Sequence, residues 1–175
     1  MAHVPNLCLL LSLFSFTGQQ SEMPQWQRIT DEDESFTIRI PGKHTQTIKE
    51  KTIAQGVKLR ITHYIAKPQG GRLACLFSFS EVEDGVAAPE SAQNRLNRVR
   101  GQFSRPGHKI LKEENVRLKN HPGVKLLIDM GKNRQMRVTI YATRNRLYQQ
   151  IVIGSKKGIQ SPTANRFLDS LQLDR

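Results

Sequence analysis

The stretch from Gly123 to Gly154 constrains the fold of this chain more than any other. It contains three segments in which apolar and polar residues alternate, at 123–130, 136–143 and 147–153. Their apolar rows are Val124, Leu126, Ile128 and Met130; Val138, Ile140 and Ala142; and Leu147, Ile151 and Ile153. Side chains of a β-strand point to opposite faces in turn, so each row can lie on a common core. Because the connecting segments are short, the stretch predicts a three-stranded antiparallel meander.

The rest of the chain adds further strands and two helices. Alternation predicts strands at 36–40, 46–53 (near a sheet edge), 57–65, 73–79 and 110–118. Segment 73–79 is apolar on both faces, which predicts a central strand covered on both sides. A helix is expected at 89–103, with a buried stripe made of Ala92, Leu96, Val99 and Phe103, and a second helix starts at Pro162 after the N-cap Ser161. The predicted fold class is α+β, a mostly antiparallel sheet flanked by helices on both faces (an α/β/α sandwich).

The N-terminal region predicts export. Residues 7–16 form an apolar run too short to span a bilayer and of the length found in signal peptides. We therefore expect a signal peptide at 1–20, no transmembrane span, and a secreted or periplasmic protein; the alternative is a buried N-terminal helix. Residues 21–35 are interpreted as a polar, acidic and solvated lead-in, attached to the domain by Trp26. Residues 36–175 are expected to form a single domain.

Cysteine content and motifs do not indicate an enzyme. Once the leader is removed Cys75 is the remaining cysteine, and its alternation with Leu73 and Phe77 predicts a buried, inert thiol. The sequence has no Gly-rich phosphate loop, no Gly-x-Ser-x-Gly elbow and no His-Glu-x-x-His motif. We expect no catalytic, cofactor-binding or metal-binding residues. A small hydrolase or isomerase, with a site assembled from distant residues, remains the alternative.

Charge distribution gives the main functional indication. The net charge is +12, and residues 1–90 carry nine Lys or Arg against ten Asp or Glu, whereas residues 91–175 carry eighteen against five. Such a basic half attracts anionic partners. The candidate residues are Arg95, Arg98, Arg100, Lys132, Arg134, Arg144, Arg146, Lys156 and Lys157. The two hairpin turns are expected at different ends of the middle strand, so these clusters need not form one patch.

The expected function is therefore that of a non-catalytic binding or assembly module. Its partner would be an acidic protein, an anionic polysaccharide or an anionic membrane surface. Nucleic acid is disfavoured, because no aromatic residues are interleaved with the basic clusters as stacking platforms. The competing interpretation is a generally basic surface with no single partner.

The order of elements resembles the PsbP-like family, including small exported bacterial versions of the domain. The resemblance spans roughly residues 26–173. It rests on the segment Phe36–Gly42, the Pro122-Gly123 turn, the segment Asn145–Tyr148 and the segment Arg166–Leu171. It implies an antiparallel sheet between helical layers and a non-catalytic assembly or binding role; the plant members assist the oxygen-evolving complex of photosystem II. No metal or photosystem role is transferred to residues of this chain.

Overall fold

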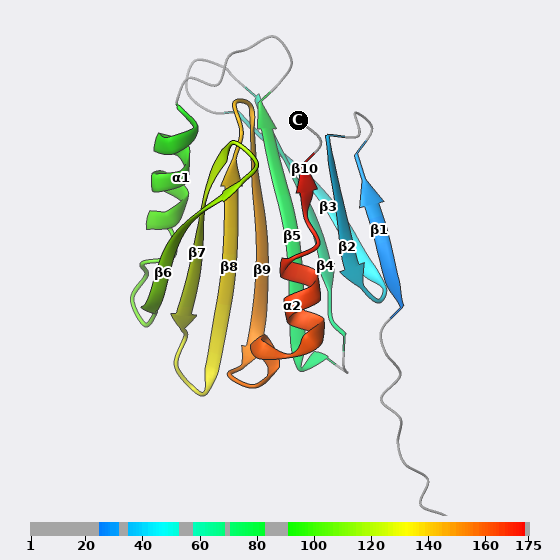
Figure 1. Cartoon of the computed structure of the whole chain (residues 1–175), viewed down its shortest axis with the longest axis vertical. Coiled ribbons are helices and arrows are strands. Elements are labelled where there is room, and N and C mark those ends of the chain that lie inside the picture. Colours follow the sequence, from blue (N-terminus) through cyan, green and yellow to red (C-terminus); the bar gives the residue numbers. More distant parts are fainter. Residues whose placement is uncertain (1–24, 32–34, 53–57, 69–70, 83–90, 174–175) are drawn as a thin grey trace, which may run out of the picture.

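The structure is a computed structural model, and it describes residues 25–31, 35–52, 58–68, 71–82 and 91–173 (Figure 1). The predicted signal peptide lies outside these residues. The strands are β1 (Trp26–Thr30), β2 (Phe36–Pro41), β3 (His44–Thr52), β4 (Lys58–Ala66), β5 (Leu73–Val82), β6 (Lys109–Leu118), β7 (His121–Asp129), β8 (Arg134–Ala142), β9 (Arg146–Ser155) and β10 (Gln172–Leu173). The helices are α1 (Ala92–Gly101), the 3₁₀ turn η3 (Gly158–Gln160) and α2 (Pro162–Leu168). None of these helices has the length and hydropathy of a membrane-spanning segment.

A large antiparallel sheet organises the molecule. Its seven strands lie in the order β3-β4-β5-β9-β8-β7-β6. The predicted meander is confirmed, since β7 pairs with β8 and β8 with β9 in antiparallel register. β3 lies at an edge and β5 lies between β4 and β9, as the sequence predicted.

One face of this sheet packs against a second, smaller sheet and α2. The small sheet has the order β1-β2-β10. Aromatic rings from both sheets fill the space between them: Phe36 of β2 lies with its ring centroid 5.1 Å from that of Phe77 and 5.0 Å from that of Phe79. Because aromatic side chains bury large apolar areas and gain from tilted contacts, this cluster is the main cohesive element of the layer. Trp26 packs on its border, as predicted.

The opposite face is covered by α1, which lies over β7 and β8. The predicted stripe of the helix packs on the predicted apolar rows of the meander, so both patterns are confirmed. The helix begins at Ala92, with the Ser91 side chain accepting a hydrogen bond from the backbone N–H of Asn94. The expected start at Pro89 lies outside the described residues. Ser161 caps α2 in the same way, as predicted.

Three expectations need correction. The α/β/α description omits the small sheet, which shares one outer layer with α2. The lead-in predicted at 21–35 contains β1, which pairs with β2 along its whole length. β5 is covered fully only on the small-sheet side, because α1 lies over β7 and β8 and leaves Ala74 and Leu76 half-buried.

Candidate functional site

Two of the predicted basic clusters meet at one end of the large sheet. In the β8–β9 ladder Arg134 lies opposite Ser155, so the β7–β8 turn with Lys132 is next to the loop with Lys156 and Lys157. All four of these cationic side chains are exposed. This proximity could not be predicted from the sequence, because residues of separate turns become neighbours only through strand register.

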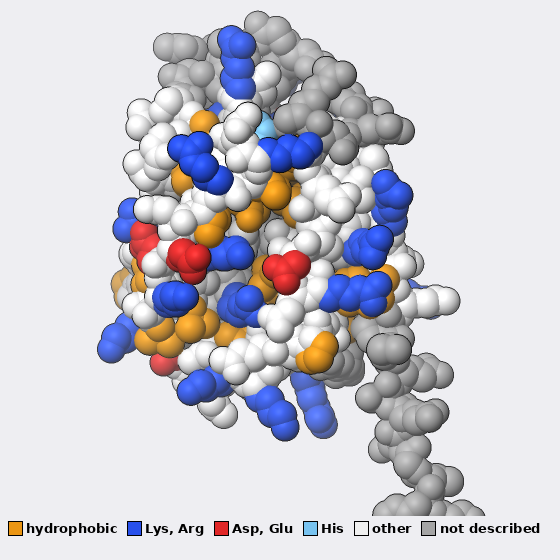
Figure 2. Space-filling view, viewed as in Figure 1, with side chains coloured by type: hydrophobic (Ala, Val, Ile, Leu, Met, Phe, Trp, Pro, Cys, Tyr) orange, Lys and Arg blue, Asp and Glu red, His pale blue; other side chains and the backbone are white. Residues whose placement is uncertain are grey.

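The same end gathers cations that sequence reasoning missed. Lys109 begins β6 opposite Asp129, Arg72 precedes β5 beside the end of β9, and Lys67 follows β4. We define the cationic end by its exposed members Lys67, Arg72, Lys109, Lys132, Arg134, Lys156 and Lys157. Figure 2 shows Lys and Arg side chains projecting along this lower edge of the molecule. The available signal was that each residue borders a predicted strand, but strand order was needed to use it.

A tight turn fixes the centre of the cationic end. Lys132 and Asn133 have positive φ angles of 49° and 58°, and the N–H of Arg134 donates to the carbonyl of Gly131 at 3.0 Å. Two positive φ angles at the central positions define a type I′ turn, whose twist matches that of the flanking strands. Asp129 accepts a hydrogen bond from the N–H of Gly131 at 2.8 Å. In the described part of the chain, no carboxylate forms an ion pair with a member of the cationic end.

Arg95 does not belong to the surface on which the sequence placed it. Its side chain is buried and donates to the carbonyl oxygens of Thr143 and Arg144, the latter at 2.6 Å. It therefore ties α1 to the β8–β9 turn. The helical wheel located Arg95 off the apolar stripe but could not show that a turn distant in sequence covers that position.

Two further candidates form ion pairs with carboxylates of the same chain. Arg100 forms an ion pair with Glu113 on β6 at 2.8 Å. Arg146 forms ion pairs with Asp31 and Glu81 and is largely buried. Arg98 and Arg144 are exposed, and Arg144 belongs to the β8–β9 turn, at the end of β8 opposite the cationic end.

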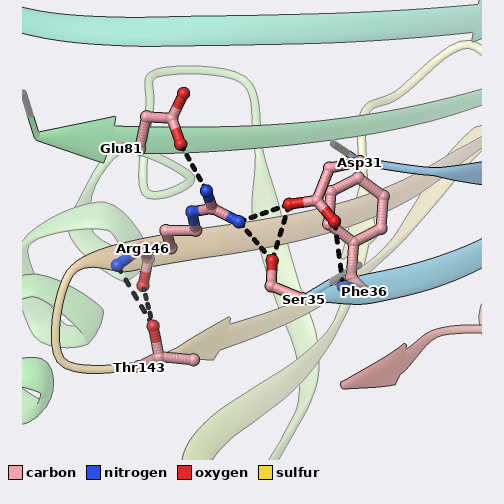
Figure 3. Close-up of polar contacts among 6 residues, drawn as sticks. All are labelled: Asp31, Ser35, Phe36, Glu81, Thr143 and Arg146. Carbon is pink, nitrogen blue, oxygen red and sulfur yellow. Dashed lines mark hydrogen bonds and ion pairs between the residues drawn. The ribbon is translucent and has the colours of Figure 1, made fainter. Parts of the chain in front are cut away.

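Arg146 is the centre of a polar network between the two sheets (Figure 3). Its guanidinium lies 2.8 Å from the Glu81 carboxylate and also contacts Asp31 and the Ser35 hydroxyl. Ser35 donates to Asp31 at 2.6 Å, and the N–H of Phe36 donates to the other oxygen of that carboxylate at 3.2 Å. Asp31 was expected to be solvated; it is instead paired and nearly buried, with a side chain 10% exposed.

The network controls the protonation of its members. Burial by itself would raise the pKa of Asp31, but hydrogen bonds from Ser35 and Phe36 and the charge of Arg146 outweigh it and lower that pKa. For Arg146 the directions are reversed. Burial by itself would lower its pKa, but its hydrogen bonds with Tyr148 and Asp31 and the charge of Glu81 outweigh burial and raise that pKa. Asp31 and Arg146 are therefore both ionised at neutral pH.

A groove of about 510 Å³ opens beside this network, between the end of β1 and the face of β3, β4 and β5. Its charged lining residues are Asp31, Glu50, Lys58, Arg60, Glu81 and Arg146. Two of these carboxylates, those of Asp31 and Glu81, form ion pairs with the one guanidinium of Arg146. Within the described residues no group of three metal-ligating side chains comes together. Cys75 is buried, as predicted, and burial raises its pKa to about 12.

Comparison with known proteins addresses the fold. No protein-family model matches the chain, and no curated protein matches its sequence. The solution structure of cyanobacterial PsbP (CyanoP) from Synechocystis matches 96% of this chain and 98% of its own, with a TM-score of 0.53 and 11% identity. A crystal structure of a Pseudomonas aeruginosa protein of unknown function matches 77% of this chain and 86% of its own, with 12% identity and a TM-score of 0.35 that supports no argument.

These observations define a mostly antiparallel β protein with two unequal sheets and two short helices. The predicted resemblance to PsbP is confirmed at the level of structure, and the chain has a PsbP-like fold. At this identity the likeness establishes the fold alone.

Proposed function

We propose that the protein is an exported, non-catalytic binding module that engages an anionic partner through its cationic end. The observation that carries this proposal is the convergence of the β7–β8 turn and the loop after β9, each with two exposed cations, at one end of a rigid sheet. Acidic proteins, anionic polysaccharides and anionic membrane surfaces all present the complementary charge.

Local electrostatics support this assignment. Uncompensated cations on one rim produce a positive potential that attracts anionic surfaces and speeds association. Among the described residues, Asp129 brings a carboxylate close to the cationic end. That carboxylate accepts a hydrogen bond from the backbone N–H of Gly131 in the turn. Since the turns are held by the strand ladders, the backbone that carries these cations needs little reorganisation to meet a partner.

The groove beside Arg146 favours the non-catalytic function over a hydrolase or isomerase. General bases act best when their pKa lies near the working pH. The arrangement around Asp31 does the opposite, because its hydrogen bonds and the Arg146 charge hold the pKa of the carboxyl below its ordinary value. We therefore assign this network a structural role.

Retention on three probes at several salt concentrations tests the proposal. The probes are immobilised heparin for a polysaccharide, vesicles of phosphatidylcholine with phosphatidylglycerol for a membrane, and immobilised polyglutamate for an acidic protein. We expect retention on at least one probe at about 0.15 M salt, falling steeply as salt rises because bound counterions are released and charges are screened. The probe that retains the protein best identifies the class of partner.

Paired double variants localise the interaction. Lys132→Glu with Lys156→Glu reverses two charges at the cationic end, and Arg117→Glu with Arg144→Glu reverses two exposed charges elsewhere with the same change in net charge. The first variant should weaken binding at least about tenfold and the second much less, because screening confines the effect to nearby charges. Equal weakening by both variants, or no retention on any probe, would contradict the proposal.

A further inference from the structure

The edge strand β3 is long, regular and open. It pairs with β4 through nine consecutive residue pairs, from His44 opposite Ala66 to Thr52 opposite Lys58, with no register shift. Every residue from Thr45 to Thr52 is exposed. Among the described residues, no backbone hydrogen bond joins β3 to an element other than β4. An edge of this kind presents unpaired N–H and C=O groups to a further strand.

The other edge of the large sheet differs. β6 pairs with β7 with a register shift between Ile110 and Lys112, and Leu111 lies at that irregularity. Bulges of this kind twist an edge away from further pairing. Ile48 on β3 is 46% exposed and Leu111 on β6 is 44% exposed, and each lies on an edge strand. Of the two described edges of the large sheet, only β3 is thus regular with an exposed apolar residue at its centre.

The sequence of β3 is complementary to itself in one register. Antiparallel pairing of two copies over the full length of the strand places its central residue, Ile48, opposite its own counterpart. The other pairs are Lys49 with Thr47, Glu50 with Gln46, Lys51 with Thr45 and Thr52 with His44. No like charges stand directly opposite one another, and opposed β-branched residues stabilise antiparallel pairs.

We propose that the protein forms a homodimer by antiparallel pairing of β3 with β3 of a second copy, centred on Ile48. The two large sheets then continue into one another about a twofold axis normal to the sheet. An interface limited to one strand pair gives a weak, concentration-dependent dimer.

Sedimentation equilibrium over a range of protein concentrations tests the dimer. The full chain should dissociate reversibly as it is diluted. Ile48→Asp places two carboxylates opposite one another at the centre and should raise the dissociation constant at least about tenfold. Leu111→Asp is the matched control on the other edge strand, and it should leave the dissociation constant unchanged. A protein that is monomeric at every concentration, or variants with equal effects, would overturn the proposal.

Oxidative crosslinking tests the register itself. Directly opposed residues of an antiparallel pair have Cα atoms about 4.5–5.5 Å apart, within the range a disulfide spans. Ile48→Cys should therefore give a covalent dimer under mild oxidation. Glu50→Cys, opposite Gln46 of the second copy, should not, because its counterpart lies four residues further along the strand. The proposal would also be overturned by crosslinking through residue 50 but not residue 48. The same holds if β3 pairs with a strand of another protein and the chain does not associate with itself.

Discussion

The guanidinium of Arg146 on β9 lies 2.8 Å from the carboxylate of Glu81 on β5, its neighbour in the large sheet. The same guanidinium reaches Asp31, which follows β1 of the small sheet. One side chain thereby joins the two sheets that enclose the aromatic core. Arg146 was predicted to bind an external anion, and the structure instead gives it two internal ones.

Replacing Arg146 with Met should destabilise the protein by about 2 kcal/mol, because two poorly solvated carboxylates lose their partner. The methionine retains much of the packing of the arginine stem over Phe79. Urea unfolding measures the effect. Arg144→Met, in the same turn but exposed, is the control and should change stability by less than about 0.5 kcal/mol. Equal effects of the two variants would rule out the bridging role.

Asp31 should make the free energy of unfolding depend on pH in the acid range. Burial opposes its ionisation, but Ser35, Phe36 and Arg146 lower its pKa below the ordinary value of 3.8. The folded state therefore binds fewer protons than the unfolded state, and the stabilisation is complete above the unfolded pKa. It is lost as the pH falls from 3.8 through the folded pKa.

Urea unfolding of the wild type and Asp31→Asn at a series of pH values checks this sign. The wild type should be the more stable at neutral pH, and the difference should shrink as the pH falls below about 4. Subtracting the variant removes the titration of other carboxylates. A difference that stays constant over this range would show that Asp31 contributes nothing through its charge.

Arg95→Met should cost about 2 kcal/mol, since the carbonyl oxygens of Thr143 and Arg144 lose charged donors. Arg100→Met on the same helix removes a solvent-exposed ion pair with Glu113 and should cost less than about 1 kcal/mol. Thermal or urea unfolding distinguishes the two. If Arg100 proved the more costly of the pair, the anchoring of the turn by Arg95 would be wrong.

Gly123→Ala should destabilise the meander by about 2–3 kcal/mol through overpacking. A Cβ atom at this position would lie 2.5 Å from Cδ1 of Tyr141 and 2.6 Å from the carbonyl oxygen of Ile140, both on the neighbouring strand. Gly101→Ala is the control, because a Cβ atom there meets no atom within 4 Å and alanine is the better helix former. Gly101→Ala should be neutral or stabilising in the same unfolding assay.

Sequence patterns predicted the elements well where the signal is local. Alternation in the meander and the spacing of Leu96 and Val99 depend on residues a few positions apart, so each pattern reveals which face is buried. The strand β1 was missed because Trp26–Thr30 has only weak alternation and acquires its partner, β2, from the hairpin. The small sheet was missed with it, and this changed the composition of one outer layer.

The candidate surface was predicted only in part. Lys132, Arg134, Lys156 and Lys157 were identified as basic turns, but the strand ladder was needed to bring them together. Arg95 could not be assigned, since nothing near it in sequence reveals that the β8–β9 turn lies over it.

The sequence alone determined the strands of the meander, their buried rows, the cap of α2 and the excess of positive charge in the second half. Each of these depends on neighbours within one or two turns of chain. Tertiary structure decided which charges remain at the surface. Arg146 and Asp31 are 115 residues apart, and only the stacking of the two sheets makes them partners. The partners of a long charged side chain are set by strand order and packing, so they cannot be predicted from the local sequence pattern.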